Sequence, residues 1–286
     1  MKIIEPHVEL WSEENVSPES HIAHCARVCY GKEYKEPNQK ADEKMVNGLI
    51  KSGHLSMLRH ASIYLSNVGN LSNYLKDRIF HSDYWNYTIK YAYASTNLQE
   101  FKNFEKLIED EYDSEHISTI DNKSFLKECT KNPELFKLYR LTFCITTQIS
   151  TSRELNRVSP NNIAERSTRY CTAKDGLEIC SPWWLNTSIE DIVYTSAYYN
   201  LISRAEETYK LLLFKGMKPE DARGVLPLDT ATKVIYTYSI KEWQHILDLR
   251  LYDKTGRAHS NCHVVMQMVK DQINKFAKEH NINYQV

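Results

Sequence analysis

The sequence predicts a mixed fold of α-helices and β-strands (α+β class) from two kinds of apolar spacing along its 286 residues. In residues 141–148, Leu141, Phe143 and Ile145 alternate with threonine or cysteine, and this period of two is typical of a strand. Elsewhere apolar residues recur every three or four positions, as they do on the buried face of a helix. A hydrophobic fraction of 42% provides enough apolar residues for a sizeable core.

The first part of the chain predicts a short apolar segment, two helices and a polar loop that faces a ligand. The first helix starts after Ser17, a residue type that caps helix N-termini, and the second covers roughly residues 42–51. Residues 53–60 then place two histidines and a serine hydroxyl between a helix end and a predicted strand at 61–66. These side chains suit either a bound ligand or a structural hydrogen-bonding role, which is the commoner use of a single histidine.

Residues 67 to about 138 are polar, and they contain neither a motif nor a repeat. Their apolar spacing predicts helical patches at 71–80, 101–112 and 125–139. We interpret the segment as an insertion between two paired strands. On this interpretation it covers one face of the functional site or acts as a lid.

The C-terminal part is predicted to be mostly helical. Its expected elements are a strand with a loop at 171–186, a helix at 189–216, a short helix and turn at 218–228, and a last helix at 261–278. Between them, Trp243, Ile246 and Leu247 mark a buried helix face, and Arg250 is the next position on that face. Because a guanidinium cannot lose its charge, we expect Arg250 to have a partner, either a structural carboxylate or a ligand.

Charge and cysteine content narrow the class of protein. A net charge of −1 argues against a nucleic-acid binder that relies on bulk electrostatics. No apolar run approaches about 18 residues, and the N-terminal residues lack a signal-peptide core, so neither a membrane span nor secretion is predicted. Seven scattered cysteines favour a reduced, cytoplasmic protein. No metal site is predicted, because no cysteine or histidine pairs have the spacing of zinc ligands.

The densest group of chemically useful side chains lies in residues 152–170, directly after the predicted strand. Four arginines, two glutamates and serine hydroxyls stand there at a junction of strand, short helix and loop. Such a set of donors suits a small anionic, hydrogen-bonding molecule. The alternative is a solvated charged turn without a ligand.

Four blocks of sequence, in order, resemble the flavin-dependent thymidylate synthases over nearly the whole chain. The first two are Ala26-Arg-Val-Cys-Tyr30 and Gly53-His-Leu-Ser56 through His60. The third is Arg157 with Glu165, Ser167, Thr168, Arg169 and Tyr170, where the family carries Arg-His-Arg, seven residues and Ser. The fourth is Ala222-Arg-Gly-Val-Leu-Pro227 followed by Glu242-Trp243, His245 and Leu249-Arg250.

The resemblance implies one domain over residues 1–286, with a central, mostly antiparallel sheet, flanking helices and an insertion at about 67–138. It implies transfer of a one-carbon unit from 5,10-methylenetetrahydrofolate to C5 of dUMP, with FAD and NADPH as cofactors and dTMP as product. It also implies a homotetramer whose active sites are shared between subunits. In keeping with the family, none of the cysteines has an evident activating base.

The resemblance also implies roles for individual residues. The catalytic residue is Arg250, which would stabilise charge on the deprotonated uracil. The residues expected to bind dUMP are Glu154, Arg157, Glu165, Arg166, Ser167, Thr168, Arg169, Arg223 and Arg250. Those expected to bind FAD or folate are His54, Ser56, Arg157, Val158, Ser159, Glu165, Ser239, Lys241 and His245.

Several positions depart from the family pattern, mainly on the flavin side. Arg-His-Arg is replaced by Arg157-Val158-Ser159, and Arg59 stands where the family has an acidic residue. Ser239 and His245 align with asparagines that hold the flavin in the family. Two other functions therefore stay open. One is hydroxymethylation of C5 of dUMP or dCMP, which needs no net hydride, and the other is nucleotide binding without catalysis.

Overall fold

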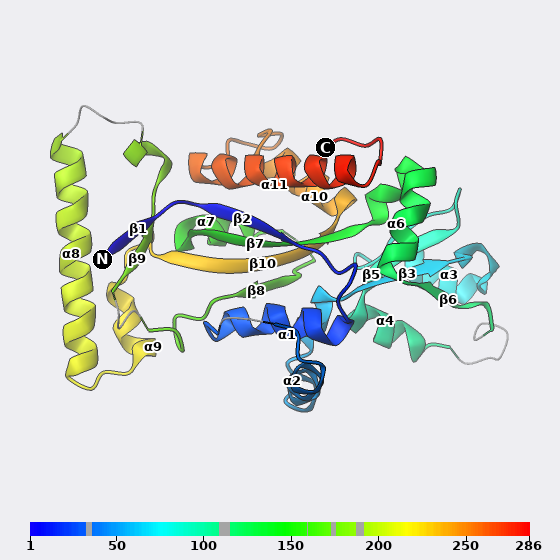
Figure 1. Cartoon of the computed structure of the whole chain (residues 1–286), viewed down its shortest axis with the longest axis horizontal. Coiled ribbons are helices and arrows are strands. Elements are labelled where there is room, and N and C mark those ends of the chain that lie inside the picture. The colour runs from blue at the N-terminus through cyan, green and yellow to red at the C-terminus, as the bar shows by residue number, and fades with distance from the viewer. Residues whose placement is uncertain (33–35, 109–114, 159, 173–175, 187–191) are drawn as a thin grey trace.

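The computed structural model describes residues 1–32, 36–108, 115–158, 160–172, 176–186 and 192–286. Helices and antiparallel sheets make up the described part, so the predicted α+β class is confirmed. Two four-stranded sheets lie side by side along the long axis, with a two-stranded parallel sheet near one end (Figure 1). None of the described helices combines the length and the apolar character needed to cross a membrane.

The main sheet has the strand order β2-β7-β10-β8, and every neighbouring pair is antiparallel. Its members are β2 (His7–Trp11), β7 (Arg140–Gln148), β8 (Ile163–Glu165) and β10 (Ala231–Ser239). The predicted strand at 141–148 is therefore confirmed as β7, all nine residues of which are buried. Its alternation separates two covered faces, because Phe143 packs toward α10 and α11 whereas Cys144 packs toward α1.

Helices cover both faces of the main sheet (Figure 1). On one face lie α7 (Ile149–Leu155), α10 (Ile240–Arg250) and α11 (Ser260–Glu279). On the other lies α1 (Pro18–Cys29), with α2 (Gln39–Lys51) packed beneath it. Ser17 caps α1 as predicted, since its side chain accepts a hydrogen bond from the Ser20 backbone N–H.

The second sheet corrects the prediction for residues 67–138. Helices α3 (Asn73–Phe80), α4 (Leu98–Glu105) and α6 (Asn122–Lys131) are present, followed by the 3₁₀ helix η3 (Pro133–Leu138), and η2 is another 3₁₀ turn (Val68–Asn70). The same segment also supplies three strands, β4 (Asn86–Thr88), β5 (Tyr93–Asn97) and β6 (Ser118–Ile120), which join β3 (Ser62–Ser66) in the order β4-β5-β3-β6. The prediction of helices alone was wrong because these strands are short and rich in Asn, Ser and Thr, and so lack an apolar alternation.

The expected pairing of the strands on either side of this segment was also wrong. β3 belongs to the second sheet and β7 to the main sheet, so the chain leaves one sheet before it enters the other. The predicted strand at 61–66 is β3 of the second sheet. The 3₁₀ helix η1 (Leu55–His60) precedes it and connects it to the helices of the main sheet, because η1 contacts both α1 and α4.

At the end of the molecule away from the second sheet, β1 (Lys2–Ile4) pairs in parallel with β9 (Glu178–Cys180). The short apolar N-terminal segment thus forms β1 and β2. Around this small sheet lie the 3₁₀ helix η4 (Trp183–Asn186), α8 (Ile192–Phe214), α9 (Pro219–Ala222) and the 3₁₀ helix η5 (Arg223–Val225). The predicted helices at 189–216 and 261–278 are confirmed within the described residues as α8 and α11, with a turn at 215–216 after the end of α8.

Candidate functional site

The segment after β8 carries most of the predicted nucleotide-binding residues, and hydrogen bonds of its backbone fix it to two elements. The Arg166 N–H donates to the Lys233 carbonyl of β10 at 2.9 Å, and the Ser167 N–H donates to the Cys29 carbonyl at the end of α1 at 3.0 Å. A further bond, from the Cys171 N–H to the Ser167 carbonyl at 2.9 Å, closes a turn. The loop is therefore held in place by hydrogen bonds of its own backbone, and its side chains at 166–168 are half-buried.

A cavity of about 630 Å³ opens between this loop, α7 and the η5–β10 connection, and we name it the arginine cavity. Three arginines line it from three separate elements: Arg153 on α7, Arg166 on the loop and Arg223 on η5. Ser167 and Thr168 add two hydroxyls between them. The group thus combines several guanidinium donors with neutral donors, which is the composition that suits a phosphate.

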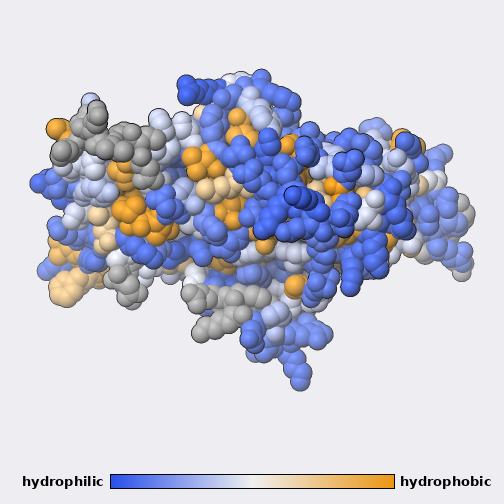
Figure 2. Space-filling model, turned by 45° about the horizontal axis from the view of Figure 1, so that its top comes forward, coloured by the Kyte–Doolittle hydropathy of each residue, from blue (hydrophilic) through white to orange (hydrophobic). Residues whose placement is uncertain are grey.

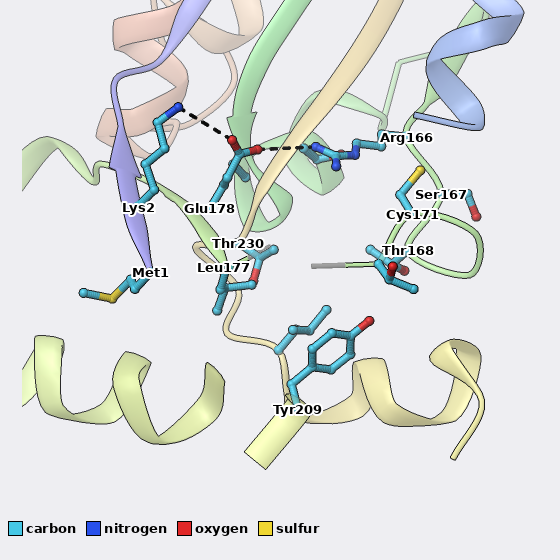
Figure 3. A pocket seen from close by; sticks show the side chains of 15 residues that line it. Met1, Lys2, Arg166, Ser167, Thr168, Cys171, Leu177, Glu178, Tyr209 and Thr230 are labelled. Carbon is cyan, nitrogen blue, oxygen red and sulfur yellow. Dashed lines mark ion pairs between the residues drawn. The ribbon is translucent and has the colours of Figure 1, made fainter. Parts of the chain in front are cut away.

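A second cavity of about 400 Å³ adjoins the first, because the two share five lining residues, among them Arg166 and Thr168. Figure 3 shows Glu178 of β9 between two cations, with its carboxylate 3.9 Å from Lys2 Nζ and 3.5 Å from an Arg166 guanidinium nitrogen. Tyr209 of α8 closes the opposite side. Glu178 therefore neutralises part of the positive charge on this side of the loop.

At the arginine cavity, Arg223 is joined to the loop after β8 by a direct contact, and Arg169 is paired just outside the lining residues. A terminal nitrogen of Arg223 donates to Thr168 Oγ1 at 3.1 Å, and Arg223 Nε donates to the Glu220 carbonyl. Arg169 forms an ion pair with Glu220 at 3.2 Å. Thr168 and Arg223, which are 55 positions apart in the sequence, thus meet at the arginine cavity, whereas Arg169 lines neither cavity.

Glu165 lines the arginine cavity and is oriented by neutral donors. Its carboxylate accepts hydrogen bonds from Ser152 Oγ at 2.8 Å, Thr232 Oγ1 at 3.2 Å and Asn156 Nδ2 at 3.2 Å. Asn156 is in turn oriented by the hydroxyl of Tyr236, which donates to its side-chain oxygen at 2.7 Å. The carboxylate is therefore held in one position beside the arginines. Its three donors are uncharged, so they do not neutralise it.

Arg250 stands on the other side of α7. Its guanidinium lies 3.8 Å from the Glu154 carboxylate, and its Nε is buried with no hydrogen-bond partner among the described residues. Glu154 also accepts from the His259 backbone N–H at 3.3 Å. The expected partner of Arg250 is thus a carboxylate, and neither of the two cavities is lined by Arg250 or Glu154.

Of the described residues expected to hold a flavin, only Glu165 lines one of the two cavities. His54, Ser56, Arg157, Lys241 and His245 are exposed, on three separate segments, and line neither of the two cavities. Val158 packs in the main core, and the Ser239 hydroxyl accepts from the Glu242 N–H as the cap of α10. Ser159 lies outside the described residues. The residues present therefore do not fit a flavin within one chain.

Most thiols of the chain are buried, and the described side chains form no metal-binding group. Burial raises the pKa of six thiols, so these stay protonated at neutral pH: Cys25, Cys29, Cys129, Cys144, Cys180 and Cys262. Within the described ranges, no group of three His, Cys, Asp or Glu side chains could hold a metal ion.

Sequence reasoning missed several residues at these cavities. Arg153 was seen as part of the charged stretch but was not assigned to the site, and the helical period of α7 would have separated it from Glu154. Glu178, Tyr209 and Glu220 carried no local signal, because they reach the site only through the packing of β9, α8 and α9 around the loop.

Comparisons with curated proteins give short matches to one family. The chain is 45% identical over 49 residues to a flavin-dependent thymidylate synthase of Halobacterium salinarum, and 37% identical over 59 residues to a probable flavin-dependent thymidylate synthase of Paramecium bursaria Chlorella virus 1. These matches span 17% and 21% of the chain, and only 20% and 27% of the length of those relatives.

Among solved structures, the chain is similar to the UMP/dUMP methylase PolB from Streptomyces cacaoi bound with 5-Br dUMP. The TM-score is 0.45 at 17% identity, over 96% of this chain and 93% of that one. The sequence profile of the family described as thymidylate synthase complementing protein (Thy1) matches residues 82–277, about two thirds of the chain. This chain therefore belongs to the Thy1 family, the flavin-dependent thymidylate synthases.

Proposed function

We propose that the chain transfers a one-carbon unit from 5,10-methylenetetrahydrofolate to C5 of dUMP and yields dTMP. Membership of the family supports flavin-dependent chemistry of this class. The observation that carries the proposal is the meeting of Arg153, Arg166 and Arg223 with Ser167 and Thr168 at one cavity. A nucleotide phosphate is the ligand that such a group of guanidinium and hydroxyl donors recognises best.

In this proposal Arg223, Ser167 and Arg169 bind the phosphate. Arg223 uses two of its N–H groups on Thr168 and on the Glu220 carbonyl, so its remaining donors are available to an anion. Arg169 is paired with Glu220, a partner that orients its guanidinium and also competes with a phosphate for it. Release of Arg169 from Glu220 would then accompany nucleotide binding.

We propose that Arg250 contacts the uracil base of the nucleotide. Deprotonated uracil carries negative charge, and a guanidinium at the ring edge stabilises that charge and raises electron density at C5, the carbon that attacks the folate methylene. The buried Nε of Arg250 provides an unused donor for that contact. Glu154, at 3.8 Å, is too far for a short hydrogen bond and holds the side chain mainly by charge.

FAD and NADPH are proposed on family membership alone, because neither of the two cavities among the described residues gathers the set expected to hold a flavin. The missing contacts would come from other copies of the chain in a homotetramer with shared sites. We further propose that residues 1–286 act as one domain and work in the reducing cytoplasm, which suits seven free cysteines.

Helix α8 supports assembly with a second copy. It lies at the end of the molecule where Figure 2 shows hydrophobic surface, and Leu201, Leu211 and Phe214 are 64%, 55% and 84% exposed. A helix that is apolar on its outer as well as its inner face is usually buried in an assembly. An antiparallel second α8 that brings Leu201 against Leu211 would place Arg204 opposite Thr208 and next to Glu207, so apolar residues and opposite charges of the two copies come together.

A second candidate function is hydroxymethylation at C5 of dUMP or dCMP. The observation that favours it is the use of Val158 in the core and of Ser239 as a helix cap, because both positions match the flavin side of the family. Addition of water in place of hydride would end the reaction at a hydroxymethyl base without flavin.

The test is incubation of the purified chain with each nucleotide and the folate, with and without added FAD and NADPH, followed by mass analysis of the base. Methyl product that depends on FAD supports the thymidylate synthase. Hydroxymethyl product without FAD supports the alternative. Nucleotide binding with no exchange of the C5 hydrogen for deuterium would leave a catalytically inactive relative and refute both.

A further inference from the structure

We propose that Arg59 is a positioning residue. Through it, the second sheet and its helices hold the turn at residues 160–162, which leads into β8. Arg59 belongs to η1, and its guanidinium makes two hydrogen bonds in two directions. Nε donates to Gln99 Oε1 of α4 at 2.7 Å, and a terminal nitrogen donates to the Asn161 carbonyl at 2.8 Å. The same guanidinium lies 5.4 Å from the centre of the Tyr84 ring.

These contacts connect segments that are far apart in the sequence. Gln99 and Tyr84 both belong to the segment expected to be an insertion, whereas Asn161 lies 102 residues after Arg59 in the loop that carries the altered signature. Gln99 and the Tyr84 ring fix the plane of the guanidinium, and the remaining N–H groups are thereby aimed at the turn.

The turn depends on outside support because β8 is only three residues long and lies at the edge of the main sheet. Its neighbour Asn162 is held from β10, where the Asn162 N–H donates to the Tyr238 hydroxyl at 3.4 Å and the Asn162 carbonyl accepts from the Thr237 N–H at 3.2 Å. Arg59 restrains the neighbouring residue Asn161 from the side of the second sheet. The turn is thus clamped between the two sheets.

Restraint of this turn affects the arginine cavity because β8 connects the turn directly to the residues that line the cavity. Three residues of strand span about 10 Å. At the far end stand Glu165 and then Arg166, Ser167 and Thr168, all of which line the cavity. A turn that shifts at Asn161 would therefore displace the donors that we assign to the phosphate.

This position also changes the expected role of residues 67–138. None of residues 67–108 or 115–138 lines either cavity, so within one chain these described residues do not form a lid over the site. Their contact with the site is instead indirect, through Gln99 and Tyr84 to Arg59 and on to the turn. The effect on nucleotide binding rests on the proposed function, whereas the effect on the turn does not.

The experiment compares the full-length chain with Arg59→Met, Arg59→Lys and Gln99→Met. The control is Arg78→Met, which removes an exposed arginine that packs at 5.3 Å from the ring of Tyr74 and makes no contact with the turn. Hydrogen–deuterium exchange of the amides in residues 160–165 reports the turn, thermal unfolding reports global stability, and titration with dUMP reports the cavity.

We expect Arg59→Met to speed exchange at 160–165 about tenfold and to weaken dUMP binding several-fold, with β7 and α11 unchanged. Gln99→Met should show the same pattern more weakly. Arg59→Lys should keep the melting temperature yet not restore protection, because an ammonium lacks the planar fork that reaches both acceptors. Arg78→Met should match the wild type.

Unchanged exchange at 160–165 in Arg59→Met would overturn the proposal, and so would faster exchange spread evenly over all elements. Full protection in Arg59→Lys would also overturn the requirement for the guanidinium fork. If the wild type binds no dUMP but Arg59→Met still loosens the turn, the proposed function fails and the role of Arg59 stands.

Discussion

Replacement of Arg223 by alanine is predicted to weaken dUMP binding while leaving the fold intact. The side chain is exposed, and its contacts in the free protein are the Thr168 hydroxyl at 3.1 Å and the Glu220 carbonyl. Exposed contacts of this kind contribute little to folding, so we expect a change in unfolding free energy of at most about 0.5 kcal/mol.

The effect on binding is larger because the bond to a phosphate is charge-assisted. Such a bond contributes about 1.5–3 kcal/mol, which corresponds to a roughly ten- to hundredfold increase in the dissociation constant. Arg153→Ala should give a similar loss if both arginines face the same anion across the arginine cavity. Arg257→Ala is a matched control, since this exposed arginine lines neither cavity.

The assay is calorimetric titration with dUMP and, in parallel, with deoxyuridine, which lacks the phosphate. The reasoning requires that Arg223→Ala weakens dUMP binding and leaves deoxyuridine binding nearly unchanged. Equal losses for both ligands would place Arg223 elsewhere, and no loss for either would remove the phosphate from this cavity.

Four further predictions test the assembly, the buried histidine, the helix cap and the shared site. Leu201→Glu combined with Leu211→Glu should lower the mass measured by light scattering, and an unchanged mass would exclude α8 as an interface. Burial lowers the pKa of His60 to about 3, so the unfolded state binds more protons than the folded state between about pH 3 and 6.5, and the free energy of unfolding falls as the pH drops through that range. In acid unfolding of His60→Gln, the slope of the unfolding free energy against pH should be shallower by about 1.4 kcal/mol per pH unit. Ser239→Ala should cost about 1 kcal/mol in thermal unfolding through loss of the cap, and a loss of flavin binding at unchanged stability would contradict this structural role. Mixtures of Arg223→Ala and Arg250→Lys chains should recover part of the C5 deuterium exchange that each lacks alone, and a mixture with no exchange would count against shared sites.

The sequence predicted those parts of the fold whose apolar spacing is set by burial on a definite face. β7 was found because its two covered faces select different residues, and α1 because Ser17 and the apolar stripe agree. The sequence predicted β3 of the second sheet, but β4, β5 and β6 were missed because they are three to five residues long, and Asn86 and Ser95 are buried in them although they are polar. The spacing of apolar residues within a segment does not show which distant strand will pair with it.

The same limit applies to the site. Arg166, Ser167 and Thr168 could be found as a local cluster, but their meeting with Arg223 came from the resemblance. Arg153 stood in the same charged stretch without being assigned to the site, and local patterns gave no sign of Glu178 or Glu220. Such residues reach the cavity through the packing of separate elements. Ser239 shows the converse, since its hydroxyl serves the N-terminus of α10, a role that a following Glu242 predicts from sequence alone.

Helix α7 divides the proposed nucleotide site in two. Arg153 on this helix lines the arginine cavity, and the next residue, Glu154, contacts Arg250. Consecutive residues on a helix point about 100° apart, and a helix with its side chains is about 10–12 Å across. Side chains that leave α7 about 100° apart thus place the arginine cavity and the Arg250 contact on different sides of the helix. In the proposed function, a nucleotide with its phosphate in this cavity would meet the Arg250 of another copy, and the mixture of Arg223→Ala and Arg250→Lys chains tests that arrangement.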